Sequence, residues 1–200
     1  MPSPTKTYQT GSIRKTVPLF YDWDDCPNLK NPKCRSPFRL DQGRTVLIQN
    51  ALFKNQTQWR CIGFITRQGD SQIGYVQSQF IKPHQSTQAV ISAKTWSKKW
   101  RDGSQSIVIR PDAKHPGKLL VQGTAFWHGL GDNVHTGSVD ASAKPNGAFM
   151  RVSEGSGQES GKDTSEFDCQ LSLRLIPPFL VAEDNDHCGG MNVRFNGLYH

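Results

Sequence analysis

Two histidines and an aspartate in the second half of the chain, His128, Asp132 and His135, have side chains and a spacing that could supply metal ligands. The Gly-Leu-Gly sequence after His128 favours a loop over a helix, and no further ligand stands at a regular spacing. We therefore predict that these three residues lie in a loop that contacts a partner. We expect no bound metal and no cofactor.

Other local motifs for ion binding or catalysis are absent from the sequence. The run Glu183–Asp186 is similar to the start of a calcium loop, but no Glu follows at the expected position, so a solvated acidic turn is predicted. There is no phosphate-binding glycine loop followed by GK[ST], and no GxSxG elbow. The two carboxylates of a glycoside hydrolase are defined by their distance in the folded protein and not by their spacing in the sequence, and no pair of them stands out here. We predict a non-enzymatic protein, with a dispersed active site as an alternative.

The cysteines predict disulfides and an oxidising compartment. Cys169 lies on the apolar face of an alternating segment and Cys188 precedes the last such segment, so we predict a bond between them, with a buried thiol as the alternative. In the first half Cys26, Cys34 and Cys61 compete for one bond, and the sequence does not decide which pair forms.

A basic and aromatic cluster follows the middle of the chain. Its members are Trp96, Lys98, Lys99, Trp100 and Arg101. Such a cluster could form a rim that stacks on sugars or bases, and the alternative is that the two rings close one end of a barrel.

The overall charge favours an anionic partner. Lysine and arginine number 24 against 17 acidic residues, a formal net charge of +7, which suits nucleic acid, an anionic glycan or an acidic protein. Dispersed charge that serves only solubility is the alternative. No stretch approaches the ~20 apolar residues that span a bilayer, and the polar opening is expected to be that of a mature exported form without its signal peptide.

Alternating apolar and polar residues predict an all-β fold, and helix signals are almost absent. In the second half the predicted strands are 106–110, 119–128, 148–152, 167–175 and 192–199. In the first half they are 16–20, 44–53, 58–66 and 72–77.

The predicted strands fall into two domains. Residues 1–12 are expected to be a flexible N-terminus, residues 13–83 a first domain and residues 94–200 an antiparallel barrel or sandwich. The polar, Pro-containing stretch 82–89 indicates the boundary, and residues 84–93 are the predicted linker. The Gly- and Ser-rich segment 153–165 is expected to be a mobile hairpin loop.

Residues 13–83 resemble a bacterial SH3-like domain. The resemblance rests on the Trp-bearing strand at Trp59, on Gly74-Tyr75-Val76, and on the closing turn at Phe80-Ile81. It implies a small β-barrel.

The C-terminal half resembles exported bacterial β-proteins and, loosely, proteins grouped as periplasmic lysozyme inhibitors. The signature is Asp184, Asn185, Cys188, Gly189, Gly190, Asn192, Val193, Phe195, Gly197 and Tyr199. The resemblance implies a periplasmic or secreted protein.

Together these features predict an inhibitor or immunity protein that binds a cell-wall-directed enzyme or toxin. A peptidoglycan- or carbohydrate-binding module is the first alternative, and nucleic-acid binding fits the cysteines less well. The contact is expected in the loop 128–136 or in 153–165, with the Trp96–Trp100 rim next.

Overall fold

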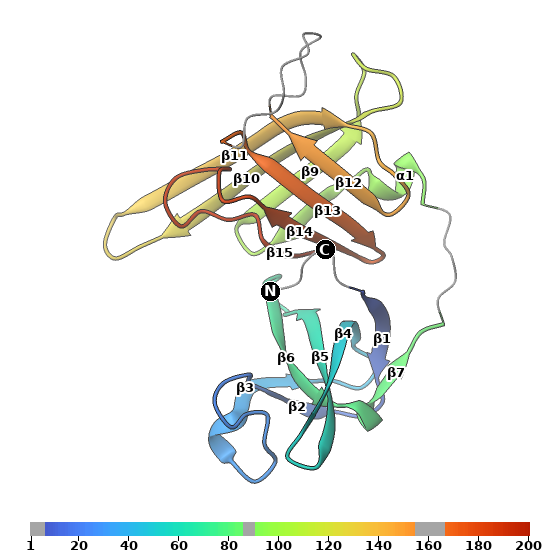
Figure 1. Cartoon of the computed structure of the whole chain (residues 1–200), viewed down its shortest axis with the longest axis vertical. Helices are drawn as coiled ribbons and strands as arrows, with labels where there is room; N and C mark the ends of the chain where they lie inside the picture. Colours follow the sequence, from blue (N-terminus) through green and yellow to red (C-terminus); the bar gives the residue numbers. More distant parts are fainter. Residues whose placement is uncertain (1–6, 86–90, 155–166) are drawn as a thin grey trace. The chain divides into compact units, whose positions relative to one another are not determined.

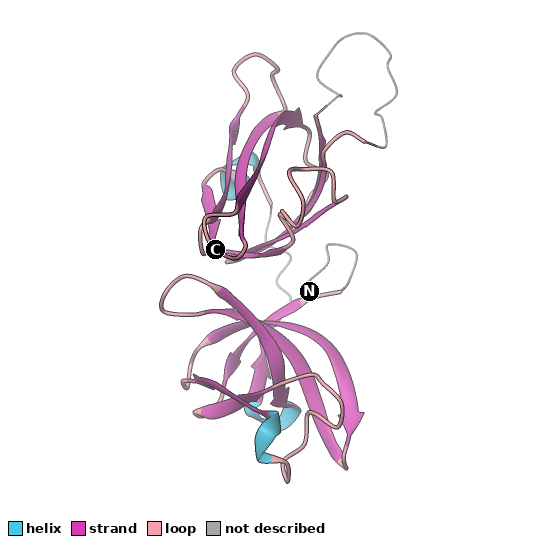
Figure 2. Cartoon of the chain, turned by 90° about the vertical axis from the view of Figure 1, so that its left-hand side faces the viewer, coloured by secondary structure: helices cyan, strands magenta, loops and turns pink. Residues whose placement is uncertain are grey.

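A computed structural model describes residues 7–85, 91–154 and 167–200 (Figure 1). The chain divides into two compact units, one over Thr5–Gln88 and the other formed mainly by Ala89–His200. Strands dominate both units (Figure 2). In the described residues, helix is limited to α1 (Ala93–Trp96) and the 3-10 turns η1 (Pro32–Cys34) and η2 (Ser78–Phe80). The all-β prediction is therefore confirmed.

The first unit is one antiparallel sheet of seven strands in the order β3-β2-β6-β5-β4-β1-β7. Its strands are β1 (Gln9–Ile13), β2 (Val17–Phe20), β3 (Arg35–Leu40), β4 (Thr45–Lys54), β5 (Thr57–Ile65), β6 (Ser71–Gln77) and β7 (Ile81–Pro83). Apolar residues at alternate positions, such as Val46 and Ile48, bury against Ile62 from the neighbouring strand. Residues 9–12 belong to β1 and pair with β4, so the prediction of a flexible segment there is wrong.

A disulfide-closed loop covers one end of this sheet. Cys26 and Cys34 form the bond, with their Cα atoms 5.3 Å apart, and Cys61 is not part of a disulfide. Lys54, at the end of β4, donates through Nζ to the carbonyl oxygens of Asp24 (2.7 Å) and Cys26 (2.6 Å). The loop is thus held both covalently and by the tip of the β4–β5 hairpin.

The second unit consists of two four-stranded antiparallel sheets, in the orders β11-β10-β9-β8 and β12-β13-β14-β15. The first contains β8 (Lys99–Asp102), β9 (Gln105–Pro111), β10 (Leu119–His128) and β11 (Val134–Ala143). The second contains β12 (Phe149–Ser153), β13 (Gln170–Ile176), β14 (Phe179–Asp184) and β15 (Gly197–Tyr199). One core joins Ile107 and Val121 of the first sheet to Leu173 of the second, which is sandwich packing.

A pair of backbone hydrogen bonds joins these two sheets along one side. Arg101 in β8 donates to the carbonyl oxygen of His200 at 3.0 Å, and His200 donates back to Arg101 at 2.9 Å. Among the described residues the strands of neither unit close into a barrel. The predicted antiparallel sheets are therefore present, and the second unit follows the sandwich alternative, whereas a closed barrel is not found.

Two strand predictions in the second unit are wrong at their ends. The segment 192–199 forms a strand only over Gly197–Tyr199, because the preceding residues follow an irregular path fixed by side-chain hydrogen bonds. Phe167 was expected on the buried face of its strand, yet it lies before β13 and is 70% exposed.

The two disulfides are typical of proteins that fold in an oxidising compartment. The second of them joins Cys169 to Cys188, the pair that the sequence pattern indicates. No helix in the described ranges is long and apolar enough to cross a membrane.

We predict that Cys188→Ser lowers the free energy of unfolding by about 2–5 kcal/mol, because the bond restricts the unfolded chain and anchors the segment before β15. Denaturant unfolding measures the change, and peptide mapping without reductant checks the pairing. The control is Cys61→Ser, which removes a thiol outside both disulfides. Recovery of Cys169 and Cys188 as alkylated thiols from the wild type would contradict the pairing.

Candidate functional site

The β10–β11 hairpin extends beyond the sheet to which it belongs (Figure 1). β9 pairs with β10 only from Leu119 to Thr124, whereas the pairing with β11 continues to His128. The turn is closed by a hydrogen bond from the Gly129 amide to the Asn133 carbonyl at 2.8 Å. The predicted contact loop 128–136 is therefore the turn of a projecting hairpin and the start of β11.

The two faces of this hairpin separate its histidines. Trp127 is paired with His135, and His128 is paired with Val134. Because successive side chains of a strand point to opposite faces, His128 and His135 lie on opposite sides of the ribbon. The arrangement cannot gather His128, Asp132 and His135 around one ion. No group of three metal-ligand side chains occurs in the described residues.

His135 anchors the hairpin to the irregular segment before β15. Its ring lies 5.1 Å from the Trp127 ring, and its Nδ1 hydrogen-bonds the carbonyl oxygen of Met191 at 2.6 Å. A further bridge pairs Gly137 with Gly189, where a side chain on either glycine would overlap the other strand. The base of the hairpin is therefore held by the segment that the C-terminal signature occupies.

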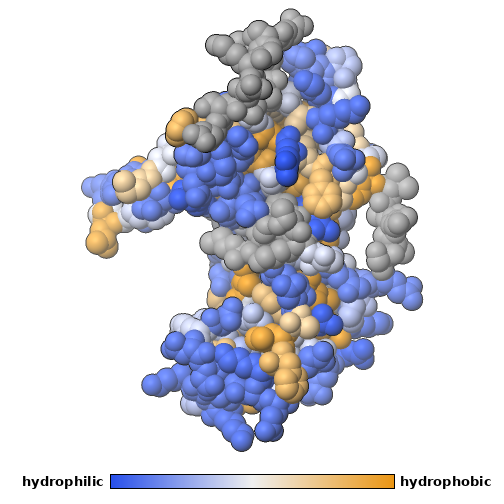
Figure 3. Space-filling view, in the orientation of Figure 1, coloured by the Kyte–Doolittle hydropathy of each residue, from blue (hydrophilic) through white to orange (hydrophobic). Residues whose placement is uncertain are grey.

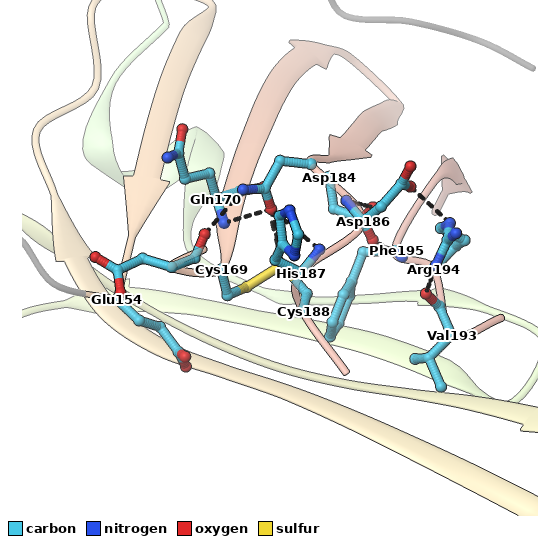
Figure 4. Close-up of a disulfide and its surroundings, with 12 residues drawn as sticks. Glu154, Cys169, Gln170, Asp184, Asp186, His187, Cys188, Val193, Arg194 and Phe195 are labelled. Carbon is cyan, nitrogen blue, oxygen red and sulfur yellow. Dashed lines mark hydrogen bonds and ion pairs between the residues drawn. A yellow bond between two sulfur atoms is a disulfide. The ribbon is translucent and has the colours of Figure 1, made fainter. Parts of the chain in front are cut away.

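That segment is built from side-chain hydrogen bonds in place of a strand ladder (Figure 4). The Asp184 carboxylate accepts from the amides of Asp186 (3.0 Å) and Phe195 (2.5 Å). Asn185 accepts from the Gln170 amide at 3.0 Å and donates to the Asp168 carbonyl at 2.8 Å. The prediction of a solvated acidic turn holds for Asp186, whose side chain is 62% exposed, but not for Asp184 and Asn185, which cap the backbone.

The far end of the hairpin exposes apolar side chains (Figure 3). Phe126 and Val134 lie on its outer face, and Leu130 at the turn is 98% exposed. Met191, whose carbonyl binds His135, is 75% exposed. Exposed apolar side chains grouped on a projection are typical of surfaces that bind another protein.

The predicted rim at Trp96 and Trp100 is not a stacking surface. Both indoles are buried, and their Nε1 groups donate to the Gly147 carbonyl (3.2 Å) and the Trp96 carbonyl (3.0 Å). Lys98 lies over the Trp100 ring at 4.0 Å. The rings therefore close the core, as in the alternative interpretation, and Lys98, Lys99 and Arg101 remain exposed around them.

A hydrogen-bonded cluster around Asp112, on the loop between β9 and β10, was not predicted from the sequence. The side chain of Asp112, 7% exposed, accepts from His115 Nδ1 at 2.7 Å, from the Ser142 hydroxyl and from the Lys114 amide at 2.8 Å. The hydrogen bonds from Ser142 and His115 hold the pKa of the Asp112 carboxyl well below its usual range. Ser142 donates to the carboxylate and not to His115, so it is not an activated nucleophile.

The remaining contact prediction, the loop 153–165, lies outside the described residues except for Ser153 and Glu154. The Glu154 carboxylate accepts from the Asp140 amide at 2.9 Å and so occupies the edge of β11. Comparison of the chain with known families, with curated proteins and with solved structures gives no match.

We predict that Gly137→Ala lowers the free energy of unfolding by about 1–3 kcal/mol, because the added methyl would overlap the Cys188 carbonyl and push the irregular segment away from the hairpin. Thermal unfolding measures the loss, and Trp127 fluorescence reports the displaced segment. Ser138→Ala, at the next position of β11, should change neither. Equal stability of the two variants would contradict the close approach.

We predict that Asp112→Asn destabilises the protein at neutral pH and that this difference shrinks in acid. A carboxyl with a lowered native pKa contributes its stability in full above its ordinary pKa of about 3.9. That contribution is lost as pH falls from there toward the lowered native value. Melting temperatures of wild type and variant between pH 7 and pH 2 test this. Asp41→Asn, at an exposed pair with Arg67, should show a much smaller difference.

Proposed function

We propose that this protein is an exported, non-enzymatic inhibitor or immunity protein that binds a cell-wall-directed enzyme or toxin through the end of the β10–β11 hairpin. The observation that carries the proposal is the projection itself. Leu130 is exposed at its turn and Phe126 and Val134 lie on its outer face. A convex apolar end of this kind is complementary to a concave cleft in a partner.

The support at the base of the hairpin favours binding with little rearrangement. The hydrogen bond from His135 to Met191 and the Gly137–Gly189 bridge tie the hairpin to the core. A binding element that is already ordered loses less conformational entropy when it binds. The net charge of +7 would also speed association with an acidic partner.

We assign the first unit to the SH3-like class and the second to the exported β-proteins with the C-terminal cysteine and glycine signature, in a periplasmic or secreted location. The Cys26–Cys34 and Cys169–Cys188 bonds support an exported protein. The antiparallel pairing in both units supports the two fold assignments.

The test is an inhibition assay with dye-labelled peptidoglycan and the wall-degrading activity of an envelope extract. The wild type should suppress dye release in a saturable way. The double variant Phe126→Ser/Leu130→Ser should need about 30-fold more protein, since truncating apolar anchors at an interface costs roughly 2 kcal/mol.

The matched control is Phe53→Ser, which removes an exposed apolar side chain in the first unit. It should inhibit as well as the wild type. Absence of inhibition by the wild type, or full inhibition by the hairpin variant, would overturn the proposal. The rival carbohydrate-binding function predicts co-sedimentation with peptidoglycan without any effect on its degradation.

A further inference from the structure

A second surface of the β8–β11 sheet has the features of a binding site for a polar ligand. A groove of about 560 Å³ lies over the ends of β9, β10 and β11 and the turn that joins the first two. Its polar lining includes Arg110, Asp112, His115, Gln122, Asp140 and Ser142. The volume suits a small ligand, and the lining combines these polar groups with apolar surface from Pro111, Leu120 and Ala141.

Three side chains form a hydrogen-bonded row across the floor of this groove. Arg110 on β9 donates through Nη2 to Gln122 Oε1 on β10 at 3.0 Å, and Gln122 Nε2 donates to Asp140 Oδ2 on β11 at 2.9 Å. The amide therefore stands between the guanidinium and the carboxylate. Each group is oriented before a ligand arrives, which reduces the entropy lost on binding.

The row retains capacity for a ligand. A guanidinium has five N–H donors and a carboxylate has about four acceptor positions, and the row uses one of each. The floor thus offers donors at the Arg110 end and acceptors at the Asp140 end. Hydroxyl groups, which both donate and accept, are complementary to such a row.

The turn at the end of the groove is also fixed. Asp112 accepts from His115 and from Ser142, which ties the turn to β11 across the groove. The Asp112 carboxylate keeps its charge, but it accepts from His115, Ser142 and the Lys114 amide, so the cationic side chains at this end that are left for contact with an anion are those of Arg110 and Lys114. This end suits an anionic group.

We infer that the groove binds a sugar that carries a carboxylate, with the carboxylate on Arg110 and neighbouring hydroxyls on Gln122 and Asp140. Arginine binds carboxylates through two parallel N–H groups, and side-chain carboxylates accept from hydroxyls. The site is separate from the outer end of the hairpin, so this inference goes beyond the proposed function and does not depend on it.

The test is isothermal titration of the full chain with digalacturonic acid and with its neutral dimethyl ester. The acid should bind at least tenfold more tightly than the ester. Arg110→Gln should weaken binding of the acid at least tenfold and remove the preference, as expected for loss of the charge-assisted contact with the carboxylate. Gln122→Leu should weaken binding of both sugars.

Two controls separate this site from the hairpin and from general charge. Arg67→Gln removes an exposed arginine in the first unit and should bind the acid like the wild type. Phe126→Ser/Leu130→Ser should also bind it normally, even if that variant no longer inhibits. Failure of the wild type to bind the acid, equal affinity for acid and ester, or an Arg110→Gln variant with unchanged affinity would each overturn the inference.

Discussion

The second unit depends on the hydrogen bonds that side chains make to the backbone between β14 and β15, where no neighbouring strand provides partners. Buried or half-buried backbone amides need hydrogen-bond partners, and here side chains provide them. Asp184 caps the amides of Asp186 and Phe195, and Asn196 Oδ1 accepts from the Asp184 amide at 2.6 Å. The Cys169–Cys188 bond then fixes the same segment to β13. Because Gly189 and Met191 contact β11, the position of the projecting hairpin follows from this network.

This dependence explains the C-terminal signature as a structural requirement. Phe195 and Tyr199 are fully buried, and the Tyr199 hydroxyl lies within hydrogen-bond distance of Gln105 Oε1 (2.9 Å) and the Phe195 carbonyl (3.0 Å). Burial raises the pKa of Tyr199 far above its usual value, so its hydroxyl stays protonated. Position 189 requires a glycine because the backbone there passes directly against Gly137. The signature thus fixes a scaffold, and the two sites proposed for binding, the end of the hairpin and the groove, lie outside it.

The sequence predicted the strands whose apolar residues alternate. It missed β14, although its first four residues are buried, because a continuous apolar run lacks the period-two pattern. β10 and β13 alternate apolar and polar residues because one face of each lies in the core, and period-two patterns report that burial. β11 was missed because it is an edge strand in which few side chains are buried, chiefly Val139 and Ala143. Because β11 was not predicted, two interactions of its residues were not predicted either. These are the hydrogen bond from Ser142 to Asp112 and the row of side chains that ends at Asp140, and both depend on the register of β11 against β10. The burial of Trp96 and Trp100 was only an alternative interpretation, because it depends on tertiary packing, while the charged residues next to them in the sequence suggest an exposed segment.

The edge of β11 limits how a partner can bind. An unpaired edge strand normally invites another strand to add to the sheet. Here the Thr136 carbonyl accepts from Gly190 at 3.1 Å, and the Asp140 amide donates to Glu154 at 2.9 Å. These contacts occupy outward-facing backbone groups at both positions, so strand addition over 136–140 would have to displace them. The proposed partner would therefore gain more by contacting side chains at the end of the hairpin, where burying the exposed Leu130 and Val134 displaces none of these hydrogen bonds.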